Sequence, residues 1–154
     1  LKAAESIEAG KSFEEVVYQT EKAVQNTKIF VHVKTLKYMA RSGRINKITG
    51  MAGKLLNLKP VVSIDENGEG IILGKALSDS SSKKKMQALV SNIAQSKNIT
   101  GYSIVHADAE QQARQYAKEF SLLIGKEPTY ITNISSIVAM NAGVGCVAIA
   151  LTTE

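Results

Sequence analysis

The feature that most constrains the fold of this chain is a pair of short apolar runs joined by Asn67-Gly68. The runs are Pro60-Val-Val-Ser-Ile64 and Glu69-Gly-Ile-Ile-Leu73, and Asp65-Glu-Asn-Gly68 separates them. Asn-Gly is a frequent hairpin turn because both residues tolerate a positive φ. A hairpin sets two neighbouring strands antiparallel. The pattern therefore excludes a purely parallel sheet and predicts a mixed or mostly antiparallel one.

Helix signals flank this hairpin on both sides. Ser12-Phe-Glu-Glu15 forms a capping box, which predicts a helix over 12–25. A second long helix is predicted from about Ser80, and a third from a cap at Asp108 to a stop at Gly125. Shorter helices are predicted over 35–40 and 46–56, and another before the turn at 141–145.

Four further runs are rich in β-forming residues and predict strands over 28–33, 102–106, 129–134 and 146–151. The run at 28–33 is continuously apolar, which predicts a strand buried on both faces. The expected fold class is α/β, as a single lobe with a mixed, largely antiparallel sheet of five or six strands packed by helices.

Composition narrows the class of protein. The 154 residues are 44% apolar, enough for one core, and Cys146 is the single cysteine, so no internal disulfide is possible and a cytoplasmic location is expected. No run approaches the about 20 apolar residues of a membrane span. The net charge of +5 is scattered and aromatic residues are few, so nucleic acid is not expected as a partner.

Catalytic and metal-binding sets are not recognisable. His32, His106 and Cys146 have no clustered carboxylates around them in the sequence, so no metal or other cofactor is expected. The chain also has no Gly-x-Ser-x-Gly turn for a serine nucleophile. His32 is expected to be a hydrogen-bonded strand residue and Cys146 a small core residue.

Three segments, in the order of the chain, resemble the DegV family. Val33-Lys-Thr-Leu-Lys-Tyr-Met-Ala-Arg-Ser-Gly-Arg-Ile45 is similar to the family's V-D-T-L-x-Y-L-x-x-G-G-R-I segment. Leu55-Leu-Asn-Leu-Lys-Pro-Val-Val62, followed by Asn67-Gly68, resembles its L-L-x-I-K-P segment and hairpin. Asn141-Ala-Gly-Val-Gly-Cys-Val-Ala-Ile-Ala150 resembles a variant of its H-x-G-P-G-A-L-G motif.

The resemblance implies a fold and a function. DegV-like proteins have two α/β lobes that hold a long-chain fatty acid between them, and in many Gram-positive bacteria they present that acid to a separate fatty acid kinase. Residues 1–154 resemble the C-terminal lobe alone, without the N-terminal lobe. The chain is therefore expected to bind a long-chain fatty acid as a carrier and not to be an enzyme itself.

The motif matches also imply which residues contact the ligand, namely Gly43, Arg44, Asn141 and Gly143. A guanidinium binds a carboxylate through two parallel hydrogen bonds, and an asparagine amide donates one. Two departures bear on the function. Asn141 stands where the family often has His, and Leu77 stands where it often has an Arg associated with the kinase partnership.

Several alternatives remain open at this point. Arg44 could be a structural arginine, and glycines serve turns more often than ligands. The segment Ser78-Asp-Ser-Ser-Ser-Lys-Lys-Lys85 is either a helix cap with a solvated face or an anion site at a helix N-terminus. The latter would suit an enzyme or enzyme subunit acting on a phosphorylated small molecule. A purely structural lobe and a homo-oligomer are also open.

Overall fold

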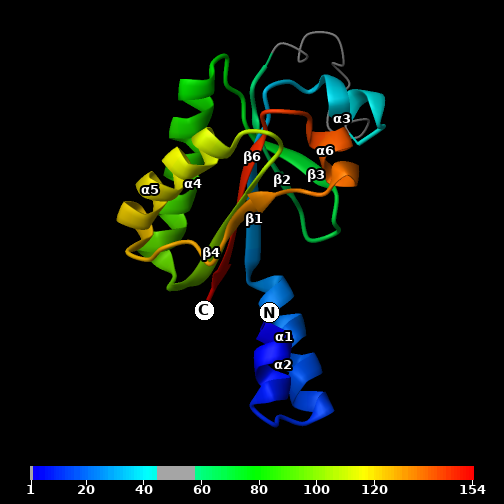
Figure 1. Ribbon diagram of the computed structural model, residues 1–154, viewed down its shortest axis with the longest axis vertical. Helices are drawn as coiled ribbons and strands as arrows, with labels where there is room; N and C mark the ends of the chain where they lie inside the picture. Colours follow the sequence, from blue (N-terminus) through cyan, green and yellow to red (C-terminus); the bar gives the residue numbers. More distant parts are fainter. Residues whose placement is uncertain (1, 45–57) are drawn as a thin grey trace.

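One mixed sheet organises the chain, and the computed structural model describes residues 2–44 and 58–154 of it (Figure 1). The strands lie in the order β3-β2-β1-β6-β4-β5. All neighbours are antiparallel except β4 and β5, which are parallel. This confirms the predicted fold class. The strands are β1 (Thr27–His32), β2 (Val61–Ile64), β3 (Gly70–Gly74), β4 (Ile99–His106), β5 (Ile131–Asn133) and β6 (Val147–Thr153).

The hairpin predicted at Asn67-Gly68 is present between β2 and β3. The chain turns between Ile64 and Gly70, which face each other across the two strands. Asp65 Oδ1 accepts hydrogen bonds from the backbone N–H groups of Asn67 and Glu69, at 2.9 and 2.8 Å. Gly68 has a φ of 78° and Asn67 does not have a positive φ. The turn is therefore wider than a two-residue turn, and glycine is needed at one position in it.

The helices of the same stretch are α1 (Lys2–Glu8), α2 (Phe13–Gln25), α3 (Lys37–Arg41), α4 (Asp79–Ser96), α5 (Glu110–Ile124) and α6 (Ser136–Ala142). Of these, α4 and α5 cover one face of the sheet (Figure 1). Met86 and Val90 of α4 and Tyr116 and Phe120 of α5 are buried there against Ile149 and the other inward residues of the sheet. This interface is the main core.

The described residues cover the opposite face of the sheet only in part. A smaller cluster of Val33, Leu36, Val62, Ala107 and Cys146 lies under α3 and α6 at one end of the strands. Beyond it, the outward residues of β1 are only half-buried, while Phe30 and His32 on the other face are buried. The prediction that 28–33 is buried on both faces was therefore wrong, because no helix among the described residues covers the rest of this face.

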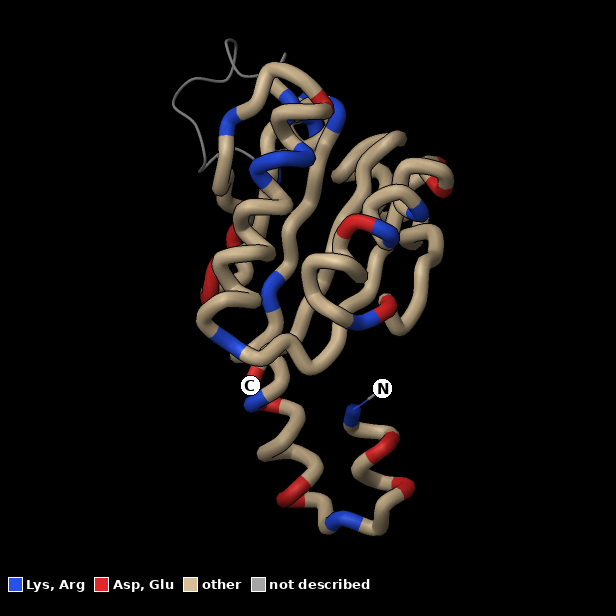
Figure 2. The backbone as a smooth tube through the Cα atoms, turned by 90° about the vertical axis from the view of Figure 1, so that its left-hand side faces the viewer, with Lys and Arg blue, Asp and Glu red and all other residues tan. Residues whose placement is uncertain are grey.

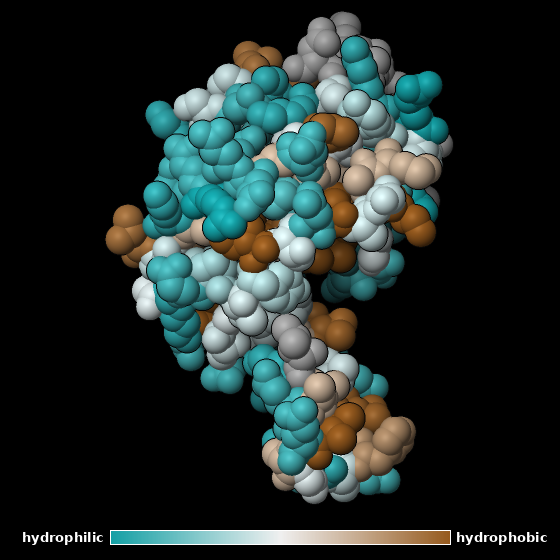
Figure 3. All heavy atoms as spheres, viewed as in Figure 1, coloured by the Kyte–Doolittle hydropathy of each residue, from teal (hydrophilic) through white to brown (hydrophobic). Residues whose placement is uncertain are grey.

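Helices α1 and α2 form an antiparallel pair that projects from the end of the sheet (Figure 1). The predicted capping box at Ser12 and Glu15 is confirmed, with the hydrogen bonds present in both directions. Ser6 Oγ donates to Gln19 Oε1 at 2.8 Å and joins the two helices. Phe13 and Val24 nevertheless stay 77% and 70% exposed. Figure 3 shows apolar side chains gathered on this pair.

Two other predictions have different outcomes. Asp108 does not cap α5, because it has a φ of 49°, Ala109 is the residue before the helix, and no side chain caps it. The Ala109 N–H lies 3.3 Å from His106 Nδ1. Gly125 ends α5 in the left-handed conformation, as predicted. The helix predicted over 46–56 lies outside the described residues.

Candidate ligand-binding groove

The partly covered sheet face holds a groove, which we call the apolar groove, of about 200 Å³. Strands β1 and β2 form its floor, and α3 and α6 form one wall. The lining residues are almost all apolar, and they are Ile29, Val31, Val33, Met39, Val62, Ser63, Ile64, Gly70, Val138, Asn141 and Ala142.

The strand geometry explains this floor. Successive side chains of a strand point to opposite faces, so Phe30 and His32 enter the main core while Ile29, Val31 and Val33 point into the groove. The alternation can be read from the sequence, but the side chains of either face could be the buried ones. Only the position of the helices shows which set is left for a ligand.

The few polar side chains of the groove are hydrogen-bonded within the chain. Ser63 Oγ donates to the backbone oxygen of Ile29 at 2.6 Å. Asn141 Nδ2 donates to the backbone oxygen of Ile137 at 2.9 Å, within its own helix. The lining therefore offers methyl and methylene surface and little unused hydrogen-bonding capacity. Such a surface suits an aliphatic ligand.

The four predicted site residues lie in two neighbouring segments. Asn141 lines the groove, and Gly143 follows directly at the end of α6. Gly43 and Arg44 follow α3, which packs beside α6. Neither Gly43 nor Arg44 lines the groove, and Arg44 is exposed. The contact of Asn141 and Arg44 with one head group remains a prediction.

Gly43 has a structural role that its surroundings show. It has a φ of 71°, its N–H donates to Ala40 O at 3.3 Å, and the N–H of Arg44 donates to Met39 O at 2.9 Å. This pair of bonds is the Schellman motif, which ends a helix at a glycine. Gly43 thus fixes the direction in which the chain leaves α3.

The turn after α6 is similarly occupied. The N–H groups of Gly143 and Gly145 donate to Ala139 O at 2.8 Å and Ala107 O at 2.7 Å, and that of Cys146 to Gly143 O at 3.4 Å. These N–H groups are therefore not available to an anion. A Cβ at Gly143, whose φ is 86°, would overlap the ring of Tyr38. Gly143 is thus needed for the packing of α3 on α6.

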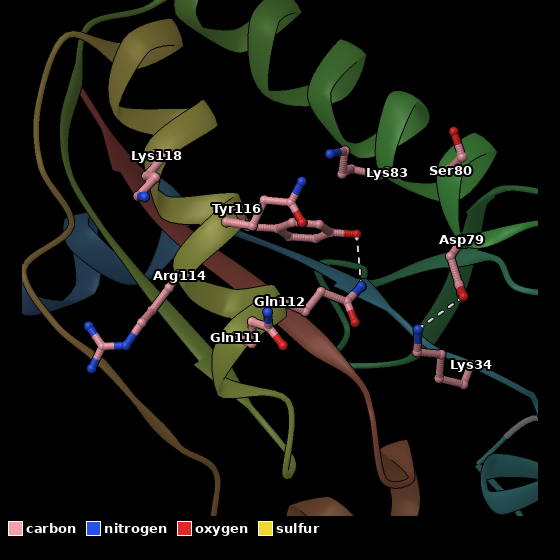
Figure 4. Close-up of a pocket in the computed structure, with 10 residues that line it drawn as sticks. Lys34, Asp79, Ser80, Lys83, Gln111, Gln112, Arg114, Tyr116 and Lys118 are labelled. Carbon is pink, nitrogen blue, oxygen red and sulfur yellow. Dashed lines mark hydrogen bonds and ion pairs between the residues drawn. The ribbon is translucent and has the colours of Figure 1, made fainter.

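A second, polar cleft of about 760 Å³ lies on the other face of the sheet, between α4 and α5 (Figure 4). It is lined by Lys34, Asp79, Ser80, Lys83, Gln111, Gln112, Arg114, Gln115, Tyr116 and Lys118. The capping box at Ser78 and Ser81 confirms the predicted cap at this end of α4.

A hydrogen-bonded network below this cleft was not predicted. Buried His32 lies with Nδ1 2.8 Å from the Tyr116 hydroxyl and Nε2 3.1 Å from Asp79 Oδ1. Lys34 and Lys59 reach Asp79 Oδ2 at 3.0 and 3.1 Å. Because a carboxylate only accepts, a neutral imidazole donates to Asp79 from Nε2 and accepts the Tyr116 proton at Nδ1. His32 is therefore a satisfied strand residue, as predicted.

Burial and the neighbouring charges together set the pKa values of this network. Loss of solvation lowers the pKa of His32, and Asp79 opposes the shift only in part. Burial raises the pKa of Tyr116 to about 12. Burial raises the pKa of Asp79, but the Lys34 and Lys59 ammonium groups outweigh it and hold that pKa below its ordinary value.

The charges of the cleft are largely paired. Besides Lys34 with Asp79, Lys83 pairs with Glu119 at 2.6 Å and Arg114 with Glu110 at 2.7 Å. Over the described residues, Lys and Arg are interspersed with Asp and Glu (Figure 2). Three of the four basic groups lining the cleft therefore already have a carboxylate partner. We assign the candidate site to the apolar groove for this reason.

The described residues do not form two other kinds of site. No group of three His, Cys, Asp or Glu side chains in this part of the chain is arranged to hold a metal ion. No helix found there has both the length and the hydropathy that a membrane crossing requires.

Comparison with solved structures gives the same fold. DegV, a fatty acid binding protein from Bacillus subtilis, superposes with a TM-score of 0.84 at 22% identity, over 100% of this chain and 55% of that one. A DegV family protein from Eubacterium eligens, loaded with heptadecanoic acid, gives 0.85 at 23% identity, over 99% and 54%.

Sequence comparison is more specific. A DegV domain-containing protein of Clostridium perfringens is 32% identical over 155 residues, which cover 100% of this chain and 54% of the relative. The chain thus spans about half the length of the relatives it matches. The model of the family described as "Uncharacterised protein, DegV family" matches residues 1–154. The chain belongs to the DegV family.

Proposed function

We propose that this chain is part of a long-chain fatty acid carrier and that the apolar groove holds part of the acyl chain. The observation that carries the proposal is the groove lining, in which the polar side chains Ser63 and Asn141 are hydrogen-bonded to the main chain. Each methylene that leaves water for such a surface contributes about 0.8 kcal/mol. A protein that stores and transfers an acyl chain needs this burial and no reactive group in the groove.

The family relationship supports the same ligand. Relatives of similar fold are fatty acid binding proteins, and one was solved with heptadecanoic acid bound. The groove lies on the sheet face that the helices among residues 2–44 and 58–154 leave partly open. We propose that the chain is one lobe and that the remainder of the protein closes over this face. The acyl chain would then be enclosed between two lobes.

The head group belongs, in this proposal, near α3 and α6. Asn141 lines that end of the groove, and Arg44 follows α3, whose Met39 lines the groove too. A guanidinium and an amide can share one carboxylate. Gly43 and Gly143 position the two segments, and their N–H groups donate to the main chain.

We also propose that the loaded protein presents the acid to a separate fatty acid kinase and has no chemistry of its own. Leu77 stands where the resemblance predicts an Arg, and it is 81% exposed. With Leu77 in place of that Arg, we expect a contact with the kinase that depends less on charge than the contact made by an Arg. Acyl phosphate formation by an added kinase, with and without Leu77→Arg, tests this point.

Calorimetric titration with hexadecanoate tests the carrier proposal. Val31→Asp places a carboxylate on the groove floor, and affinity should fall at least roughly thirtyfold, because burial of an unpaired polar group costs about 2 kcal/mol or more. Val105→Asp is the matched control, since Val105 is half-buried on β4, two strands away from β1, and does not line the groove. Equal affinity in wild type and Val31→Asp would contradict the proposal.

A further inference from the structure

A second hollow lies next to the apolar groove. Ile29 and Ile64 line the groove, and they also line this second hollow, of about 400 Å³, at the junction of α1, α2 and the start of β1. We call this the lower hollow. Ala3, Ala23 and Val24 supply its apolar walls. The two hollows thus lie next to each other along β1, with Ile29 and Ile64 lining both.

The lower hollow has hydroxyl groups, but these are bonded to the main chain. Thr20 Oγ1 donates to Val16 O at 2.7 Å, and Thr27 Oγ1 donates to Ala23 O at 2.7 Å. Lys2, at the rim, is exposed and has its ammonium group 3.4 Å from Thr100 Oγ1. An aliphatic chain therefore displaces no hydrogen bond from the inner walls.

The walls of the lower hollow are tied to the sheet. The backbone N–H of Thr153, in β6, donates to Asn26 O at 3.0 Å, directly after α2. The Ser6–Gln19 hydrogen bond holds α1 against α2. The hollow is thus walled by packed elements, with the end of α2 joined to β6 and α1 joined to α2.

We propose that the lower hollow receives the methyl end of the bound acyl chain and that Ala3 and Ala23 set the longest chain accepted. This inference rests on the proposed function. The small side chains leave room where a larger residue would fill the hollow. Each methylene buried there should raise affinity about fourfold. A short chain anchored near α3 and α6 would end before it reaches Ala23.

The test compares decanoate with octadecanoate in calorimetric titrations of the full-length protein. Ala23→Phe and, separately, Ala3→Phe should lower octadecanoate affinity about fifteenfold, equivalent to two lost methylenes, and leave decanoate affinity within about twofold. Ala4→Phe is the matched control, because Ala4 is exposed beside Ala3 and lines neither hollow. Circular dichroism checks that each variant is folded. If Ala23→Phe does not fold, Ala3→Phe still tests the inference.

Two results would overturn the inference and leave the proposed function in place. Equal losses for both acids would put the head group at the α1–α2 end. Unchanged binding of both would put the acyl chain elsewhere. If the wild-type protein binds neither acid, the proposed function fails together with the inference.

Discussion

The ring of Tyr38 lies against Gly143 so closely that no side chain fits between them. Tyr38 belongs to the first DegV-like segment and Gly143 to the last, about a hundred residues later, and their contact holds α3 against α6 beside the groove. Gly143 also has a φ of 86° and a ψ of 156°, a conformation that is essentially limited to glycine.

Replacement of Gly143 should therefore be costly. We expect Gly143→Ala to lower the free energy of unfolding by about 2–4 kcal/mol, from backbone strain and overpacking together. Urea unfolding measures the loss. Gly125→Ala is the control, because Gly125 has a φ of 76° but no atom near a Cβ, so about 1 kcal/mol is expected. Equal losses at the two positions would show that the Tyr38 contact does not matter.

The head-group proposal predicts a loss of affinity without a loss of stability. Arg44→Ala should weaken hexadecanoate binding by about 1.5–3 kcal/mol, roughly ten- to a hundredfold. The unfolding midpoint should hardly move, because the side chain is exposed. Arg41→Ala, at the end of the same helix, is the control. Asn141→His should be tolerated, since it restores the family's usual residue. Unchanged affinity in Arg44→Ala would remove Arg44 from the site.

Titration of His32 predicts a pH dependence of stability. Its folded pKa lies below the ordinary 6.5, so the unfolded chain takes up the proton first as the pH falls. The stability that the neutral, buried His32 gives to the folded state is therefore complete above about pH 6.5. It is lost as the pH falls toward the pKa of His32 in the folded state. Asp79 titrates below its ordinary 3.8, outside this range.

His32→Gln should retain hydrogen bonding and remove this titration. The free energy of unfolding, measured in urea from about pH 7 down to about pH 5, should fall less steeply in the variant than in wild type. An identical slope in the two proteins would mean that His32 is not buried in the neutral form.

The exposed face of α1 and α2 predicts self-association of this chain when it is produced alone. Ile7, Phe13, Tyr18 and Val24 are each more than 60% exposed there. Apolar patches of this kind usually mark interaction surfaces. Sedimentation velocity at rising concentration should show dimers, and Phe13→Asp should reduce them. Leu122→Asp, at an exposed apolar residue of α5, is the control and should not. A strictly monomeric wild type would argue against this surface.

Local signals predicted the local structure well. The capping box at Ser12, the glycine stop at Gly125 and the hairpin at Gly68 each depend on residues a few positions apart. Asp108 failed as a cap because aspartate also tolerates a positive φ, and the structure uses that property instead. The burial of 28–33 was overestimated because composition does not show which sheet face a helix covers.

The site was less predictable for a related reason. The His32, Asp79 and Tyr116 network joins three elements that are far apart in the sequence, and no spacing rule links them. The groove depends on which residues of β1 and β2 share a face, which follows from strand register. The motif resemblance selected Asn141 and Gly143, which lie at the end of α6 beside α3, but their roles depend on contacts such as that of Tyr38.

Native mass spectrometry of the full-length protein, purified without added lipid, tests the central claim most directly. We expect a bound species whose mass equals that of one long-chain fatty acid. The species should be lost in Val31→Asp and retained in Val105→Asp. A lipid-free protein that also fails to take up hexadecanoate would contradict the account.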